Sequence, residues 1–485
     1  MKSEPQQIIE QNKEDFSDYY DFLRFVTPDE AYKASLRREK LLNYFQSNTK
    51  WGFNRTKVDC AVLSPGCKAC GEGSWSCLFI NNICNANCFY CPTSQDEHSE
   101  PTTQTVQFPD VDDYIAYVKK FNFKGVSISG GEPFLTFDKT FRFVKRIKEE
   151  FKENIYLWLY TNGILADREK LLALKEIGLN EIRFDIGAVG YKTDKVELAC
   201  QIFDNVTVEI PAVPERQESL KELISYLTSI GVSYLNLHQI RCTPYNYKNL
   251  VKKGYTFLHG PKITVLESEL TALELIRYAK ENKIALPINY CSFIYKYRYQ
   301  RLAARKLFAP YVARDYEDLT EAGLIRTLAL IADADRIRKQ IEKFELKGIP
   351  LEHYSLSGND NKLYIKKYLW DLIIPEDFTI SLMYSKAFLL PQVSYRNVFK
   401  EVSLREGRKV VIERTPILSS EALSNNQILL FDQFFCKDPE SLNDYRHVDT
   451  VLGEWRNKCS VGEELDFMID VYDCEKLRWG LLDYY

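Results

Sequence analysis

Three cysteines stand in the stretch Ile83-Cys84-Asn85-Ala86-Asn87-Cys88-Phe89-Tyr90-Cys91-Pro92, with C-x3-C-x2-C spacing. Thiolates are the side-chain ligands that iron–sulfur clusters and zinc select. A zinc site needs a fourth local cysteine or histidine, and the nearest downstream candidate is His98. Three thiolates around a four-iron cluster leave one iron open to another molecule. The stretch therefore favours an iron–sulfur centre, with structural zinc or reactive surface thiols as the alternatives.

A second motif, Gly130-Gly131-Glu132-Pro133, follows the run Gly125-Val126-Ser127-Ile128-Ser129, which is predicted to be a buried strand. By itself the motif predicts a turn. Two glycines also let the backbone approach a ligand closely, and the proline fixes the bend. A glutamate at this place is able to hold an ammonium group.

Together the two motifs resemble those of the radical S-adenosylmethionine (SAM) superfamily, over about residues 77–260. The resemblance implies that the three cysteines bind a [4Fe-4S] cluster whose open iron chelates the amino and carboxylate groups of SAM. It also implies that the Gly-Gly-Glu-Pro strand end contacts the amino group and that Tyr90 lies near the adenine. Reductive cleavage of SAM would give a 5′-deoxyadenosyl radical that abstracts hydrogen from a substrate.

A wider span, from Cys60 to about Arg305, resembles archaeal and bacterial radical SAM proteins that are described as similar to pyruvate formate-lyase activators. The shared features are a Gly-Cys-x2-Cys element before the first strand and a Tyr-Cys-Ser element ahead of a basic helix. The resemblance implies an oxidoreductase with an electron donor such as flavodoxin or ferredoxin. A peptide or protein substrate is favoured by the long additions to the core, and a small metabolite is the alternative. A cluster-bearing electron carrier or sensor is a third interpretation, but it would need no methionine-binding turn.

Four further cysteines are a possible second metal site: Cys60, Cys67, Cys70 and Cys77. The Cys67-x2-Cys70 step is typical of a clip for zinc, a rubredoxin-like iron or an auxiliary iron–sulfur cluster, and free thiols are the alternative. If Cys77 begins a strand that ends at Ile83, a rise of ~3.3 Å per residue puts it roughly 20 Å from Cys84. The second site is then expected at the end of the barrel away from the chemistry.

Six predicted strands alternate with helices from Cys77 onward, which indicates a parallel sheet. They are Leu78–Ile80, Gly125–Ser129, Asn154–Tyr160, Glu181–Asp185, Val206–Ile210 and Val232–His238. With right-handed crossovers this pattern predicts an α/β fold, a partial (β/α)6 TIM-like barrel. The chemistry of such barrels lies at the C-terminal strand ends.

That rule selects further SAM-contacting candidates at the ends of strands three and four, namely Thr161, Asn162 and Asp185. Weaker candidates by position are Tyr160, Gly163, Glu209, Asn236, His238 and Arg241. Asp185 is equally well explained as a helix cap or an ion-pair partner, and His238 as a hydrogen-bonded core histidine. A further strand ending at Cys291 would place Cys242 and Cys291 at the same open end, as hydrogen-atom donors, metal ligands or plain buried thiols.

The predicted segments are a helical N-terminal extension (1–56), a cysteine-rich metal-binding segment (57–77), the core barrel (78–260), a barrel-capping extension (261–313) and a smaller α+β C-terminal domain (314–485). In the last segment the pattern predicts a long helix over Tyr316–Leu346 and strands at Phe378–Tyr384, Lys409–Glu413 and Gln427–Phe431. Its cysteines, Cys436, Cys459 and Cys474, are widely spaced and form no C-x2-C pair.

The composition is that of an ordinary folded protein, with 45% of its 485 residues hydrophobic and 27% charged. A formal net charge of −4 predicts no general attraction to nucleic acid or to anionic membranes. The sequence has no apolar run of about eighteen residues, so no transmembrane helix is expected, and its start lacks the apolar core of a secretion signal. Seven of the thirteen cysteines fall between Cys60 and Cys91, which favours metal binding in a reducing, cytoplasmic location.

Overall fold

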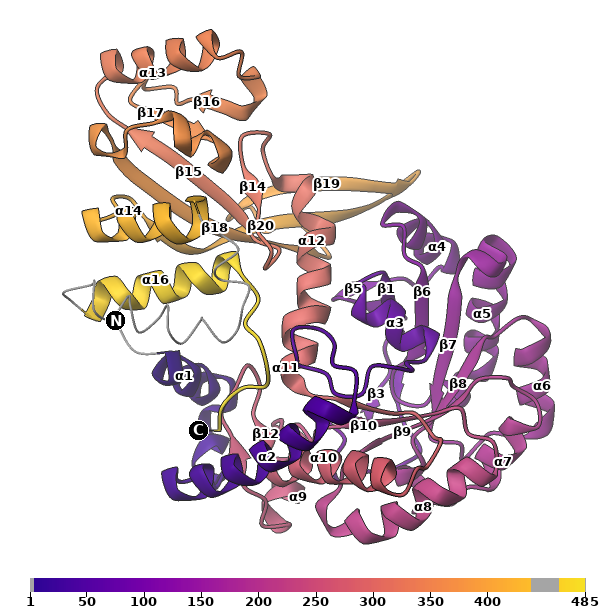
Figure 1. Cartoon of the computed structure of the whole chain (residues 1–485). Coiled ribbons are helices and arrows are strands. Elements are labelled where there is room, and N and C mark those ends of the chain that lie inside the picture. The colour runs from indigo at the N-terminus through magenta and orange to yellow at the C-terminus, as the bar shows by residue number, and fades with distance from the viewer. Residues whose placement is uncertain (1–3, 438–461, 485) are drawn as a thin grey trace. The chain divides into compact units, whose positions relative to one another are not determined.

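The central sheet is built from strands that follow one another in sequence order. In the computed structural model, which describes residues 4–437 and 462–484, its strand order is β13-β10-β9-β8-β7-β6-β1-β4-β5 (Figure 1). The seven strands from β13 to β1 pair in parallel, and β4 and β5 add an antiparallel edge. The bounds are β1 Trp75–Phe79, β4 Thr102–Thr103, β5 Val106–Gln107, β6 Gly125–Ser129, β7 Tyr156–Thr161, β8 Glu181–Phe184, β9 Val206–Pro211, β10 Tyr234–His238 and β13 Ile288–Cys291.

This sheet confirms the α/β class and the partial barrel, and β13 is the further strand that was expected to end at Cys291. Among the described strands, β13 and β5 form the two edges, so the barrel is open. The first strand differs from the prediction, because it starts at Trp75 and ends at Phe79. A separate short strand, β2 (Asn82–Ile83), pairs with β3 (Asp96–Glu97). Cys77 therefore lies in the middle of β1, not at its start.

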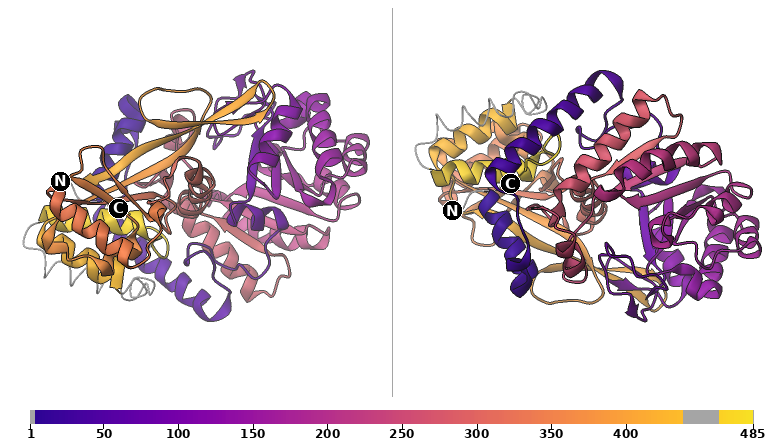
Figure 2. Two further views of the ribbon diagram at one scale, coloured as in Figure 1. Left: turned by 90° about the horizontal axis from the view of Figure 1, so that it is seen from above. Right: turned by 90° about the horizontal axis from the view of Figure 1, so that it is seen from below.

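Helices between the strands cover the outer side of the sheet (Figures 1 and 2). They are α4 Val111–Lys120, α5 Phe137–Phe151, α6 Arg168–Glu176, α7 Asp194–Cys200, α8 Gln217–Ser229 and α10 Leu266–Glu281. In α5, for example, Phe143, Val144 and Ile147 are buried on one face, which is the spacing of an amphipathic helix. The shorter α9 (Tyr247–Lys252) and α11 (Phe293–Tyr295) follow β10 and β13.

The N-terminal segment supplies helices of a different kind. They are α1 (Glu4–Phe16) and α2 (Pro28–Asn48), and a capping box between Thr27 and Glu30 starts α2. The short α3 (Pro65–Gly71) instead packs against inward-facing residues of the sheet. A Cβ on Gly66 would overlap the Arg183 guanidinium, and a Cβ on Gly125 would meet the Ala69 Cβ at 2.9 Å. The Cys67–Cys70 step is therefore inside the barrel.

The chain divides into two compact units. The barrel unit consists of Glu4–Gln300, Leu404–Arg408 and the segment from Gly480, and the C-terminal unit of Arg301–Ser403 and Lys409–Trp479. The five predicted segments are finer than this division and stay predictions.

The C-terminal unit has an antiparallel sheet in the order β16-β17-β15-β18-β20-β19, with β14 beside β15. Its strands are β14 Asp318–Leu319, β15 Ile325–Ile331, β16 Tyr354–Leu356, β17 Lys362–Ile365, β18 Thr379–Leu390, β19 Val398–Arg405 and β20 Arg408–Ser420. Its helices are α12 Arg301–Val312, α13 Ala334–Leu346, α14 Asn425–Phe431 and α16 Gly462–Glu475. Their core includes Leu328, Phe344, Trp370 and Met468.

Two predictions in the C-terminal unit are wrong. The helix expected over Tyr316–Leu346 is helical only from Ala334, because the apolar run of β15 is buried between β17 and β18. The strand expected at Gln427–Phe431 is the helix α14, which the capping box of Ser424 and Gln427 starts. The predicted strands at Phe378–Tyr384 and Lys409–Glu413 are parts of the longer β18 and β20. Cys459 lies outside the described residues.

Across the part of the chain that the structure describes, no helix combines the length and the apolar character needed to cross a bilayer.

Candidate functional site

The loop that bears Cys84, Cys88 and Cys91 follows β2 at the carboxyl edge of the sheet. Its ends are held by backbone hydrogen bonds, from Cys84 N to Gln95 O (3.0 Å) and from Cys91 N to Cys88 O (3.0 Å). All three thiols are partly exposed. Burial, then the nearby Asp185 carboxylate, raise the pKa of the Cys88 thiol to about 12, and Cys91 and Cys84 add to this rise. The three sulfurs are thus electrostatic neighbours on one loop.

This donor set fits a cluster with an open iron, because it offers three soft ligands and no fourth on the loop. Among the described residues, no three potential ligands surround a position for a single metal ion.

The two glycines of the Gly-Gly-Glu-Pro motif are needed for a backbone contact that the sequence does not reveal. The segment Asn81–Ile83, which leads into the cluster loop, packs directly on them. Gly131 N donates to Asn81 O (3.0 Å), and Glu132 N donates to Ile83 O (2.7 Å). A Cβ on Gly130 would overlap the Asn81 carbonyl oxygen, and one on Gly131 would overlap that of Ile83. The close approach that the glycines permit is that of the chain's own backbone.

The Glu132 carboxylate is held in place by donors from its own chain. Its side chain is buried, and its carboxylate accepts hydrogen bonds from Phe134 N (2.9 Å), Thr161 Oγ1 (2.8 Å) and Asn162 N (2.7 Å). Burial raises the pKa of this carboxyl, and the three donors oppose the rise. The carboxylate thus fixes the end of β7, which places Thr161 and Asn162. Pro133 starts a 3-10 turn after it.

Asn162 connects the end of β7 to the cluster loop. Its Nδ2 donates to Asn85 Oδ1 (2.7 Å) and lies 3.7 Å from Cys84 Sγ. Its Oδ1 accepts from Ile164 N (3.0 Å). The sequence placed Thr161 and Asn162 at this edge, and the structure brings Asn162 beside Cys84 and Thr161 beside Glu132.

Asp185 follows β8 and is, as one interpretation held, a cap: its Oδ1 accepts from Gly187 N (3.0 Å) at the start of a 3-10 turn. The Tyr90 hydroxyl also donates to this carboxylate, at 2.9 Å from Oδ1. Burial raises the pKa of Asp185 to about 6, and the hydrogen bond from Tyr90 opposes the rise. Tyr90 and Asp185, which are far apart in the sequence, are thus in contact at the end of β8.

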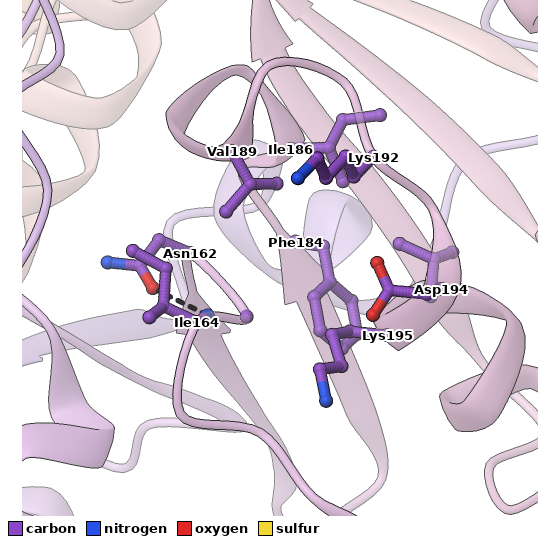
Figure 3. A pocket seen from close by; sticks show the side chains of 10 residues that line it. Asn162, Ile164, Phe184, Ile186, Val189, Lys192, Asp194 and Lys195 are labelled. Atoms are coloured by element: carbon purple, nitrogen blue, oxygen red, sulfur yellow. Dashed lines mark hydrogen bonds between the residues drawn. The ribbon is translucent and has the colours of Figure 1, made fainter.

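A cavity of about 300 Å³ opens next to Asn162, beyond the ends of β7 and β8 (Figure 3). Figure 3 shows Asn162 and Ile164 on one side of it, Phe184, Asp194 and Lys195 on the other, and Val189 between them. Its lining is Asn162, Gly163, Ile164, Phe184, Ile186, Val189, Lys192, Asp194, Lys195 and Val196. Sequence reasoning missed the loop after Asp185, although the apolar Ile186 and Val189 directly follow that candidate.

The inner face of β8, β9 and β10 bears a buried polar network. Arg183 pairs with Glu181 at 2.8 Å and with Glu209 at 2.9 Å. Asn236 donates to Glu209 at 2.8 Å, and His238 lies against the same carboxylate. Lys296 lies 2.7 Å from the other ring nitrogen of His238. Further around this face, Arg183 donates to the Tyr160 hydroxyl, and Arg241 stacks on Phe293. His238 is therefore hydrogen-bonded on both nitrogens, as its simpler interpretation held.

The four cysteines of the second group come from different elements. Cys77 is in mid-strand in β1, where it pairs with Ser127 of β6. Cys242, which is outside that group, is buried in an apolar cluster. Cys67, on α3, lies instead across the barrel among residues of β10 and β13, near Cys291.

Known proteins are similar to this chain over the part that contains the cluster loop. A model of the family described as "Radical SAM superfamily" matches residues 78–196. The "putative glycyl-radical enzyme activating enzyme" of Methanocaldococcus jannaschii is 33% identical over 306 residues, which make up 60% of this chain and 80% of that protein. The GTP 3′,8-cyclase of Aquifex aeolicus is 31% identical over 43% of this chain and 72% of that protein. Two further relatives, both described as probable GTP 3′,8-cyclases, match over only 36% and 35% of their own lengths. The structure of SuiB from Streptococcus suis bound to S-adenosylmethionine aligns with a TM-score of 0.35 and 14% identity, over 62% of this chain and 67% of that one.

Proposed function

Because this chain belongs to the radical SAM superfamily, its cofactors are a [4Fe-4S] cluster and S-adenosylmethionine, and we propose that Cys84, Cys88 and Cys91 hold the cluster. When bound and reduced, the cluster supplies the electron that cleaves SAM to methionine and a 5′-deoxyadenosyl radical. The chain is therefore an enzyme that generates a radical for use on a substrate. The electron donor, flavodoxin or ferredoxin, stays part of this proposal.

The observation that supports the cofactor site best is the position of Asn162. This one side chain contacts the cluster loop at Asn85 and also lines the cavity. A molecule held at the open iron and extending past Asn162 would enter the cavity. We therefore place the methionine part of SAM beside Thr161 and Asn162, where Gly130, Gly131, Glu132 and Pro133 set the backbone. The adenosine part lies by Tyr90 and Asp185, with the apolar walls at Phe184 and Val189 against the base.

Filling the cavity is expected to weaken SAM binding and leave cluster assembly intact. Val189→Trp adds an indole to the wall of the cavity, so the adenosine part loses its space. The dissociation constant of SAM should rise at least about tenfold, or about 1.4 kcal/mol, at unchanged iron content. Equilibrium binding to the reconstituted protein measures this. Leu172→Trp, at an exposed position on α6, is the control and should bind SAM normally; equal affinity of the two variants would place adenosine elsewhere.

SAM affinity is expected to rise with pH through the titration of Asp185. Its pKa is about 6, raised by burial, so the ionised fraction grows about fourfold between pH 5.5 and 7.5, and the ionised form is the better acceptor for a ribose hydroxyl. A raised carboxyl pKa also means that ionisation costs the fold stability as pH rises past its ordinary value; bound SAM offsets that cost. Titrations of SAM at both pH values should show about a fourfold gain in wild type and none in Asp185→Asn. The same gain in the variant would assign the effect to another group.

For the substrate we propose a peptide or protein. The relative that supports this is the M. jannaschii protein, because its name describes activation of another enzyme and this chain covers 80% of it. Hydrogen abstraction by the radical would then occur at a position in a partner polypeptide.

The source of the abstracted hydrogen tests the substrate class. Anaerobic turnover would be run with an extract of perdeuterated cells of the source organism, separated into macromolecules and a small-molecule filtrate. Deuterium in 5′-deoxyadenosine, measured by mass spectrometry, should come from the macromolecular fraction and disappear after that fraction is digested with protease. Transfer from the filtrate alone would instead establish a small-metabolite enzyme.

A further inference from the structure

Four cysteines from three separate segments lie around one buried lysine, on the β10–β13 side of the barrel: Cys60, Cys67, Cys70 and Cys291. Cys291 is the last residue of β13, and Cys67 is on α3. Asn289 Nδ2 is 3.5 Å from the Sγ atoms of both. These two sulfurs therefore lie within 7 Å of each other, although α3 and β13 are far apart in sequence.

The other two cysteines, Cys60 and Cys70, contact Lys57 and Gln300 respectively. Cys60 Sγ donates to the carbonyl of Lys57 (3.5 Å), whose ammonium in turn lies 3.5 Å from Cys291 Sγ. Cys70 Sγ accepts from Gln300 Nε2 at 3.0 Å. Cys70 follows Cys67 by about one turn of α3. The four thiols are therefore connected through Asn289, Lys57 and this turn of α3.

Lys57 gives an independent reason to expect negative charge here. Its side chain is 1% exposed. Its ammonium donates to Asn289 Oδ1 (2.6 Å) and lies near Tyr290 O and above the Tyr295 ring. None of its contacts in the described structure is with a carboxylate. A buried cation is costly unless an opposite charge compensates it. Thiolates bound to a metal centre would supply that charge, whereas four protonated thiols would not.

We propose that Cys60, Cys67, Cys70 and Cys291 hold a second iron–sulfur cluster, with Lys57 as its counter-charge. Cys291 replaces Cys77 in the ligand set that the cysteine spacing suggests. Four protein ligands leave no iron open, so this centre does not bind SAM; it is structural or transfers electrons. It also lies inside the barrel at the end of β13, not at the end remote from the chemistry.

A cluster suits this geometry better than a zinc ion. Zinc bonds of about 2.3 Å in a tetrahedron require sulfurs about 3.8 Å apart, and among the described residues no three ligands converge on a single-ion position. The same holds for Cys84, Cys88 and Cys91, which serve a cluster in this family. The ligands of a cluster bind different irons and stand farther apart. Amide donors from Asn236, Asn289 and Gln300 reach the sulfurs, and such hydrogen bonds tune the potential of a cluster.

The decisive protein is the full chain with Cys84, Cys88 and Cys91 changed to alanine, because it isolates the second site from SAM cleavage. After anaerobic reconstitution we expect it to keep about four irons and four sulfides per chain, with the Mössbauer spectrum of a [4Fe-4S] cluster. Adding Cys291→Ser should remove or degrade that cluster, whereas adding Cys77→Ser or the control Cys200→Ser should not. No iron in the triple variant, or loss with Cys77→Ser but not with Cys291→Ser, would overturn the assignment. One zinc per chain in place of iron would overturn the cluster.

Lys57 provides a test that does not depend on removing a ligand. In the same triple-alanine background, Lys57→Met should shift the reduction potential of the remaining cluster downward, because a buried positive charge favours the reduced, more negative state. Lys57→Arg keeps the charge and should restore most of the shift. An unchanged potential in Lys57→Met would contradict the role of Lys57 as counter-charge. These measurements need no SAM turnover, so they are independent of the proposed function.

Discussion

The Cys84/Cys88/Cys91→Ala variant is expected to make no measurable 5′-deoxyadenosine under conditions in which the native chain does. The three thiols are the only cysteines of the loop that lies against Asn162, so no neighbour can replace them. We expect a loss of roughly a thousandfold or more, which is about 4 kcal/mol in the barrier. Anaerobic turnover with dithionite, and quantification of 5′-deoxyadenosine by chromatography, measure the loss.

The matched control is Cys200→Ala, which removes a partly exposed thiol from α7. It should leave both iron content and product formation at the native level. Residual product in the triple variant at more than a few per cent of native would show that another site holds the catalytic cluster. That result would contradict the assignment to Cys84, Cys88 and Cys91.

Gly131→Ala is expected to disrupt the cluster loop without touching a cysteine. A Cβ at this position would overlap the backbone oxygen of Ile83, one residue before Cys84. Backbone cannot give way as a flexible side chain can, and overpacking of this kind usually costs about 1–3 kcal/mol. Either Asn81–Ile83 or the end of β6 must move, and the hydrogen bond from Glu132 N to Ile83 O is lost. Iron bound at the loop and 5′-deoxyadenosine formation should both fall at least about tenfold.

Gly358→Ala is the control for this substitution, because a Cβ there would meet no atom within 4 Å. Its thermal stability, iron content and turnover should match those of the native chain. If Gly131→Ala also assembled a full cluster and turned over normally, the explanation of the glycine pair as a backbone contact would be wrong.

The α/β class and the partial barrel could be predicted from the sequence, because the strands and helices of the barrel follow local patterns. The run from Gly125 to Ser129 is β6 to the residue, because its β-branched residues Val126 and Ile128 favour a strand. The positional rule for strand ends likewise places Thr161, Asn162 and Asp185 at the carboxyl edge of the sheet.

What the sequence could not give are contacts between distant segments. No local pattern shows that the Glu132 carboxylate accepts hydrogen bonds from three donors of its own chain, or that Tyr90 contacts Asp185. Cys291 is more than two hundred residues from Cys67, and spacing alone grouped Cys67 with Cys77 instead. In the C-terminal unit the pattern predicts helix over β15, because a seven-residue buried strand has no alternation that distinguishes it from one side of a helix.

Cleavage of SAM is tested by anaerobic incubation of the reconstituted native chain with SAM and dithionite, with methionine and 5′-deoxyadenosine quantified together. We expect both products in equal amounts, and none without reductant. A chain that assembles its cluster but does not bind SAM, and so forms neither product, would contradict this expectation and would leave an iron–sulfur electron carrier as the remaining interpretation.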